Sequence, residues 1–252
     1  MRKMQGGRDE IIRIQNDIRR PSGQWSKYVA KFLVFLHENG FDKAPKFIRF
    51  MDNGDELVSY VEGNVENELS YDLMKSDKVL ISAAKLLREY HDVSSQYIQL
   101  LTGDETWMLA VKDPVEVMCH GDFAPYNTAM IGKKAVGIID FDTLHPGNRL
   151  WDIAYALYRW VPMVDNKNTG CLNNPGYILK RIGVFMDAYR YKKISYGEII
   201  ECIIERLEYL VEFMISKAED GDKQFIRNIT DGHHIVYHND IEDLRIFLST
   251  VK

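Results

Sequence analysis

The chain has 252 residues, of which 46% are apolar and 27% charged, and its formal net charge is -5 at pH 7. This length can bury a sizeable core, and the balance is ordinary for a globular protein. A negative chain is a poor match for nucleic acid, which is bound by neutralising its phosphates. The start lacks an apolar signal core, no apolar run could span a bilayer, and the three cysteines lack metal-ligand spacing. We therefore expect a cytoplasmic protein that binds neither nucleic acid nor membrane.

The first sixty residues predict a small antiparallel sheet with one helix. The short segments EIIRI (10–14) and DIRR (17–20) flank the turn residues Gln15 and Asn16 and predict a tight hairpin. Ser26 is expected to cap a helix that ends near Gly40. Asn53-Gly54 then lies between two alternating runs, the strongest short hairpin signal.

Helical patterns dominate from residue 76 onward. Two short strands, near 115–119 and 135–140, interrupt them. The other segments with helical spacing are expected at 76–92, 150–161, 172–190, 197–218 and 240–251. A sheet-rich first part and a helical second part are separated by a predicted hinge near 59–64.

The segment "MCHGDFAPYNTAMIGKKAVGIIDFD" places polar side chains next to its expected strands, at His120, Asp122, Asn127, Asp140 and Asp142. The spacing H-x-D-x-x-x-x-N, then a strand that ends in an aspartate, is the order found in kinase catalytic segments. Phosphoryl transfer needs a proton acceptor and a metal that bridges phosphates, and Mg²⁺ prefers oxygen ligands. The joint pattern indicates such a site.

The stretches "HGDFAPYN" and "GIIDFDTLHPGNRLWDIA" resemble the aminoglycoside phosphotransferase and choline kinase family. "IRRPSGQWSKYV" and "LVSYVEG" resemble a bacterial subgroup of uncertain substrate, some of whose members are named phosphotransferases or trifolitoxin-immunity-like proteins. The resemblance implies an α+β, protein-kinase-like, two-lobed fold. The small antiparallel-sheet N-terminal lobe would span 1–61 and the larger helical C-terminal lobe 62–252.

The resemblance also implies roles for the residues of the catalytic segment. Asp122 would accept or orient the proton of the substrate hydroxyl, and His120 would brace the catalytic loop. Asn127 and Asp140 would hold the metal, and Asp142 would add a second metal or substrate contact.

One further aspartate follows in the "DIA" stretch. By resemblance, Asp152 would accept hydrogen bonds from the backbone of the catalytic loop.

On the nucleotide side, Gly6 and Gly7 lie where a phosphate-covering loop is expected, although G-x-G-x-x-G is absent. Arg20 stands where kinases place a phosphate-binding lysine. The backbone groups of Ser59 and Val61 would contact the adenine edge. These roles too come from the resemblance.

Two observations complicate this interpretation. The expected helix after Ser26 carries its only acid, Glu38, at the far end, so the usual partner of the phosphate-binding cation is missing and another acid would have to orient Arg20. Alternatively, Arg19 and Arg20 are both solvated charges on an edge strand.

Other patterns have ordinary explanations. An acidic row on the 197–218 helix is explained by a solvated face, or by attraction of a cationic substrate. Its members are Glu198, Glu201, Glu205, Glu208 and Glu212. The histidines at 233, 234 and 238 predict a polar turn before a last helix, and the aromatic residues Trp151, Tyr155, Tyr158 and Trp160 predict core.

The sequence therefore predicts an ATP- and Mg²⁺-dependent small-molecule kinase that phosphorylates a hydroxyl, for instance of a cationic amino alcohol or an aminoglycoside-like compound. The alternative is a non-catalytic binding or immunity protein with a kinase fold. A protein kinase is a weaker option, because no Ala-Pro-Glu segment follows Asp140. A metallohydrolase built on His120, Asp122 and His145 would leave Asn127 without a role. Oligomeric state has no signature in the sequence.

Overall fold

The structure is a computed structural model that describes residues 2–3, 11–67, 69–161, 163 and 174–251. The chain divides into two compact units, residues 1–152 and 153–252. The predicted lobe boundary at residue 61 lies inside the first unit and stays a prediction. None of the helices in the described ranges has the length and apolar character needed to cross a bilayer.

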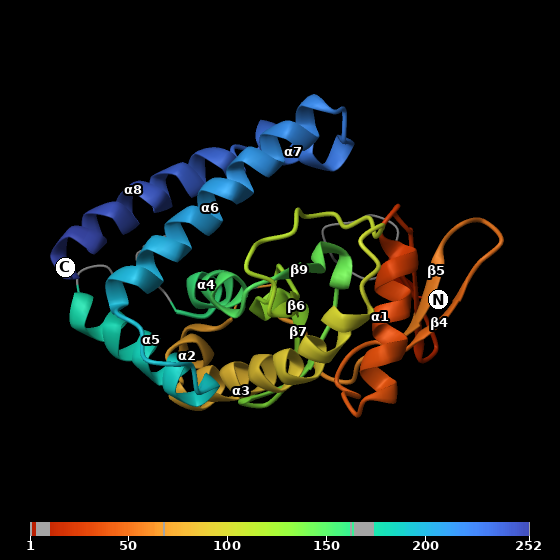
Figure 1. The fold of residues 1–252 in the computed structure, drawn as a ribbon, viewed down its shortest axis with the longest axis horizontal. Coiled ribbons are helices and arrows are strands. Elements are labelled where there is room, and N and C mark those ends of the chain that lie inside the picture. Colours follow the sequence, from red (N-terminus) through yellow and green to blue (C-terminus); the bar gives the residue numbers. More distant parts are fainter. Residues whose placement is uncertain (1, 4–10, 68, 162, 164–173, 252) are drawn as a thin grey trace. The chain divides into compact units, whose positions relative to one another are not determined.

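A five-stranded antiparallel sheet, in the order β1-β2-β3-β5-β4, forms the N-terminal part of the first unit. Its strands β4 and β5 are labelled in Figure 1. Both predicted hairpins are confirmed, because β2 pairs with β3 across Gln15-Asn16 and β4 pairs with β5 across the Asn53-Gly54 turn. Gly54 has a φ of 88°, which suits glycine. The strands are β1 (Arg2–Lys3), β2 (Ile12–Ile14), β3 (Asp17–Arg20), β4 (Phe47–Phe50) and β5 (Glu56–Ser59).

Helix α1 (Ser26–Glu38) connects β3 to β4 and buries the predicted apolar face of Val29, Phe32, Leu33 and Leu36. The predicted cap is wrong. Trp25 is the N-cap residue, and Ser26 Oγ instead accepts a hydrogen bond from the Gly23 N–H, which stabilises the turn before the helix.

The rest of the first unit places two short β-ladders next to a long helix. Strand β6 pairs with β9, β7 pairs with β8, and α3 contacts both β6 and β8. The 3-10 turns η2 and η3 carry the chain between these strands. The elements are α2 (Tyr71–Met74), α3 (Asp77–Ser94), η1 (Ser95–Leu100), β6 (Val117–Cys119), η2 (Pro125–Asn127), β7 (Thr128–Ile131), β8 (Lys134–Ile138), η3 (Phe141–Thr143) and β9 (His145–Gly147).

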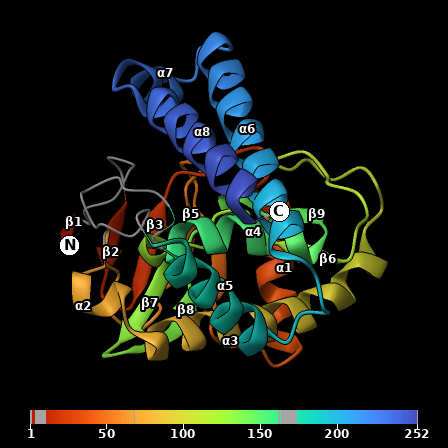
Figure 2. The ribbon, with the colours of Figure 1, turned by 90° about the vertical axis from the view of Figure 1, so that its left-hand side faces the viewer.

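The second unit is helical in its described part. Helix α4 (Arg149–Trp160) begins in the first unit and ends in the second. Helices α6 and α8 lie side by side with α7 at one end of the pair, as both views show (Figures 1 and 2). The remaining elements are α5 (Pro175–Tyr189), α6 (Tyr196–Glu219), α7 (Lys223–Thr230) and α8 (His233–Val251).

The predicted helices are confirmed except at some ends. The polar turn expected at the histidine cluster is wrong, because His233, His234 and His238 all lie in α8. Strands β7 and β9 and helix α7 have no counterpart in the sequence prediction. The four aromatic residues of α4 are buried, as predicted for core.

Candidate active site

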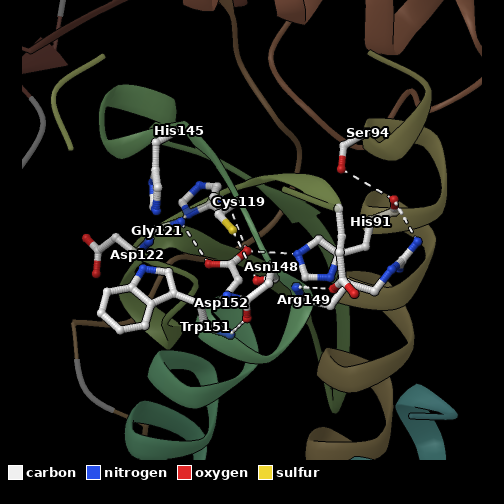
Figure 3. A network of polar contacts seen from close by, with 12 residues as sticks. His91, Ser94, Cys119, Gly121, Asp122, His145, Asn148, Arg149, Trp151 and Asp152 are labelled. Atoms are coloured by element: carbon white, nitrogen blue, oxygen red, sulfur yellow. Dashed lines mark hydrogen bonds and ion pairs between the residues drawn. The ribbon is translucent and has the colours of Figure 1, made fainter. Parts of the chain in front are cut away.

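Asp152 fixes the backbone of the loop that contains the predicted catalytic residues (Figure 3). Its carboxylate is fully buried and accepts the His120 and Gly121 backbone N–H groups, each at 2.8 Å. The ring Nε2 of His91, from α3, lies 2.9 Å from Asp152 Oδ2. The predicted contact of Asp152 with the loop backbone is therefore confirmed, and His91 is an additional partner.

Charge in this network resides on the carboxylate. Burial alone would raise the pKa of Asp152, but the hydrogen bond from His91, the nearby imidazoles and the Gly121 N–H together lower it to about 2. Burial lowers the pKa of His91 despite the neighbouring Asp152. At neutral pH an ionised Asp152 thus accepts a hydrogen bond from the Nε2–H of a neutral His91.

His120 connects the catalytic loop to the strand end that precedes Asp140. Its buried ring lies with Nε2 3.0 Å from the Ile139 carbonyl oxygen, while Nδ1 is 3.3 Å from the Asp122 backbone nitrogen. Burial lowers the pKa of His120, so a neutral ring donates from Nε2 and accepts at Nδ1. Phe141 packs edge-on against it at 4.8 Å between ring centroids. These contacts support the bracing role.

Two side chains of the same loop hold the carboxylate of Asp122. The Tyr126 hydroxyl donates to Oδ1 at 2.6 Å, and the Asn127 Nδ2 donates to Oδ2 at 2.8 Å. Asn127 Nδ2 also lies 3.0 Å from the Asp122 carbonyl oxygen, so the described contacts of this amide group use its nitrogen. This orientation leaves Oδ1 of Asn127 as the atom suited to a metal.

Asp140 is brought next to this loop by the backbone. The Ile139 N–H donates to the Asn127 carbonyl at 2.9 Å, which fixes the residue before Asp140. Asp140 itself has a φ of 61°, a left-handed conformation that few non-glycine residues adopt and that is common at functional sites. Its side chain is 43% exposed.

Arg20 joins the sheet to the segment that contains Asp140. The Nε of this buried guanidinium lies 2.8 Å from Glu56 Oε1, Nη1 lies 3.1 Å from Asp140 Oδ1, and Nη2 lies 3.2 Å from Asp142 Oδ1. Arg19 points to the other face and pairs with Asp55 at 2.5 Å. The alternative in which both arginines are solvated edge charges is therefore wrong for Arg20, which is 8% exposed and lies on an inner strand.

The electrostatics of this cluster follow from burial and charge. Burial lowers the pKa of Arg20, but the carboxylates of Asp142, Glu56 and Asp140 outweigh it and raise that pKa overall. Burial raises the pKa of Glu56, and the Arg20 charge only partly opposes this. One cation facing three acids would leave an excess of negative charge when all are ionised. A further cation is favoured nearby.

The other predicted nucleotide contacts divide into three cases. The Ser59 N–H donates to the Lys46 carbonyl oxygen at 2.8 Å, so this donor is already used within the sheet. Val61 follows β5, and the hydrogen bonds of the described residues do not engage its backbone. Gly6 and Gly7 lie outside the described residues.

The donors near Asp140 suit Mg²⁺ better than a soft metal. No group of three or more histidine, cysteine or acidic side chains in the described ranges is arranged to hold a metal alone. Asn127 Oδ1 and the exposed Asp140 carboxylate offer hard oxygen ligands, and a magnesium ion commonly completes its shell with water and phosphate oxygens. Asp142 is 4% exposed and faces Arg20, which favours a role as partner of the guanidinium. The metallohydrolase alternative gains no support, because both ring nitrogens of His120 are already engaged.

The acidic row of α6 does not form a site within the second unit. Four of its members are exposed, and the fifth, Glu208, is partly exposed and pairs with Arg245 of α8 at 2.6 Å. Glu198 belongs to a capping box with Ser195. The exposed positions fit a solvated face, and the attraction of a cationic substrate stays a prediction.

Three partners of the site escaped the sequence interpretation. His91 continues the apolar face of α3, four residues after Leu87, and that position could have marked it as buried. Glu56 opposes Arg20 across β3 and β5, a pairing that depends on knowing that β5 lies beside β3. Tyr126 has no signal in the sequence that points to Asp122.

A small antiparallel sheet, a loop fixed by a buried aspartate and a mostly helical remainder form the protein-kinase-like fold that this chain shares with small-molecule kinases. Residues 78–167 match the model of the phosphotransferase enzyme family. The predicted resemblance to aminoglycoside phosphotransferases and choline kinases is thereby confirmed.

Comparisons with solved structures agree with this fold, and one curated protein is similar in sequence. The chain is 25% identical over 207 residues to the trifolitoxin immunity protein of Rhizobium leguminosarum bv. trifolii, covering 79% of this chain and 77% of the relative. It superposes on choline kinase LicA from Streptococcus pneumoniae with a TM-score of 0.60 at 15% identity, covering 99% and 93% of the two chains. LicA is also known in complex with AMP. The gentamicin complex of APH(2")-IIa gives a TM-score of 0.52 at 14% identity, covering 85% and 83%.

Proposed function

We propose that this protein transfers the γ-phosphoryl group of ATP to a hydroxyl of a small molecule. The observation that carries the proposal is the convergence of Asp122, Asn127 and Asp140. Asp122 and Asn127 are directly hydrogen-bonded, and the backbone bond from Ile139 to Asn127 holds Asp140 beside them. The AMP complex of the structurally similar choline kinase supports nucleotide binding.

The side chains of the site have distinct roles in the proposed reaction. The carboxylate of Asp122, oriented by Tyr126 and Asn127, accepts the proton of the acceptor hydroxyl. The acceptor oxygen bonds to the γ-phosphorus as the bond from phosphorus to the β–γ bridging oxygen breaks, and ADP leaves. The Nη atoms of Arg20, which face Asp140 and Asp142, would bind the phosphates.

Asn127 and Asp140 would hold magnesium, which neutralises phosphate charge when bound. The backbone of Val61 remains the proposed contact for the adenine edge, with Gly6 and Gly7 as the proposed phosphate cover. His120 and Asp152 keep the loop in position.

For the acceptor we propose a cationic amino alcohol or an aminoglycoside-like compound, acted on in the cytoplasm. Support comes from the names of the structural neighbours, a choline kinase and a gentamicin complex. Choline, ethanolamine and gentamicin are therefore the first acceptors to test.

The direct test measures ADP release and product phosphorylation with this panel in the presence of Mg²⁺. We expect Asp122→Asn to lower kcat by roughly 10²–10⁴-fold, the usual contribution of a general base. Asp42→Asn, a change at an exposed aspartate, is the control and should leave kcat unchanged. A wild-type protein that binds no nucleotide would contradict the proposal.

The second candidate is a kinase-fold protein that protects a cell by binding a toxin without turnover. The similarity to the trifolitoxin immunity protein favours it. Asp122→Asn separates the two candidates, because protection by binding alone should survive that substitution whereas protection by phosphorylation should not. The readout is growth of a sensitive strain that expresses either form in the presence of the toxin.

A further inference from the structure

The acid that orients Arg20 comes from the neighbouring strand. Arg20 on β3 lies directly opposite Glu56 on β5 in the register of the sheet. Side chains so placed have Cβ atoms about 4.5–5.5 Å apart, close enough for an ion pair without long reach. Helix α1 offers no alternative partner, because its one acidic residue, Glu38, is exposed and lies at the last position of the helix.

Glu56 contacts one nitrogen and leaves the other two directed at the catalytic segment. The 2.8 Å ion-pair contact holds Nε beside Glu56, while Nη1 and Nη2 face Asp140 and Asp142. Nε is the inner nitrogen of the group, so a partner there orients the fork without occupying its outer edge. The outer edge is the part that grips a phosphate bidentately.

Stability alone does not explain why a glutamate is buried at position 56. Its side chain is fully buried, and a buried ion pair is often no more stabilising than an apolar pair of the same volume. An orienting role for Arg20 accounts for a charged residue at this position.

We propose that Glu56 is a positioning residue that holds Arg20 toward the nucleotide phosphates, the part that a helix glutamate plays in the kinases this chain resembles. The inference rests on the proposed function. It predicts that Glu56 strengthens binding of the nucleotide through its phosphates and has no effect on binding of the nucleoside.

The residues next to Arg20 and Glu56 in the chain provide a matched control. Arg19 and Asp55 form a similar ion pair on the other face of the sheet, with side chains 35% and 17% exposed. Asp55→Asn removes the acid that immediately precedes β5 without touching Arg20.

The test compares binding of ATP and of adenosine, each with Mg²⁺, by isothermal titration calorimetry. We expect Glu56→Gln to raise the Kd for ATP at least 10-fold and to leave the Kd for adenosine unchanged. Glu56→Asp keeps the charge but withdraws it by one methylene, and we expect an intermediate Kd for ATP. Asp55→Asn should match the wild type for both ligands.

Each outcome has a distinct meaning. If Glu56→Gln weakens ATP and adenosine equally, Glu56 is only structural and the inference is wrong. If Glu56→Gln does not fold, Glu56→Asp decides, and a folded Glu56→Asp protein with the wild-type Kd for ATP overturns the inference. A wild type that binds adenosine and ATP equally overturns it too, because the phosphates then make no contact. A wild type that binds neither ligand overturns the proposed function itself.

Discussion

The backbone N–H of Gly121 donates a 2.8 Å hydrogen bond to Oδ1 of Asp152, a residue far along the chain at the start of α4. Together with the bond from His120 N–H to Oδ2, it fixes the loop that ends in Asp122. The geometry of the candidate site therefore depends on one buried carboxylate that contacts no substrate in the proposed reaction.

Removing this carboxylate should destabilise the first unit. Asp152→Ala leaves two buried backbone N–H groups and the His91 ring without their acceptor. We expect the free energy of unfolding to fall by about 3–5 kcal/mol, the range for breaking a buried charged network. Urea denaturation measures it, with Asp42→Asn as an exposed control expected to stay within about 0.5 kcal/mol of the wild type. An Asp152→Ala protein of wild-type stability would show that the network contributes nothing.

The buried histidines make stability depend on pH. Burial lowers the pKa of His91 and of His120, so below their ordinary value of 6.5 the unfolded chain takes up protons before the folded protein does. The free energy of unfolding should thus be highest above pH 6.5 and decrease as pH falls below it. Over each pH unit in which one such histidine is protonated in the unfolded chain but neutral in the folded protein, the free energy of unfolding falls by about 1.4 kcal/mol.

A substitution tests the origin of this slope. His91→Gln retains an amide donor for Asp152 but does not titrate, so its stability should fall less steeply between pH 6.5 and 5. His238→Gln changes an exposed histidine of α8 and should retain the wild-type slope. Equal slopes in all three proteins would assign the pH dependence to other groups. Denaturant titrations at several pH values supply the data.

The close packing of Gly121 distinguishes it from another glycine with positive φ. A Cβ at Gly121, whose φ is 81°, would lie 2.5 Å from the Thr143 carbonyl oxygen, whereas at Gly132, with φ of 56°, nothing lies within 4 Å. Gly132→Ala should cost about 1–2 kcal/mol through backbone strain alone. Gly121→Ala should cost about 1–3 kcal/mol more, because the loop must shift. Thermal unfolding compares the two, and equal losses would refute the steric argument.

The hydroxyl of Tyr126 should matter for turnover more than for nucleotide binding. Tyr126→Phe deletes the 2.6 Å hydrogen bond to Asp122 Oδ1 and leaves the Asn127 bond in place. A hydrogen bond to a charged group contributes about 1.5–3 kcal/mol, so we expect kcat to fall by at least 10-fold with KM for ATP unchanged. Tyr196→Phe, at an exposed tyrosine of α6, is the control. A raised KM with an unchanged kcat would place Tyr126 on the nucleotide side instead.

The sequence predicted the elements whose signals are local. The Asn53-Gly54 turn, the apolar face of α1 and the long helices depend on residues a few positions apart, and the structure confirms them. The cap at Ser26 failed because the turn residue Gly23 competes for its hydroxyl. The short strand β9 was missed because three residues are too few to show a periodic pattern. Its extended conformation depends on its pairing with β6.

The sequence by itself determined which residues are the candidates for the chemistry of the site, because the spacing of His120, Asp122, Asn127 and Asp140 along a loop and a strand is itself the signal. Only the tertiary structure decided their partners. Glu56 meets Arg20 because β5 pairs with β3. Such contacts join residues that are distant in sequence. They form because a buried charged side chain is unfavourable unless it is paired, and local propensity does not specify that pairing.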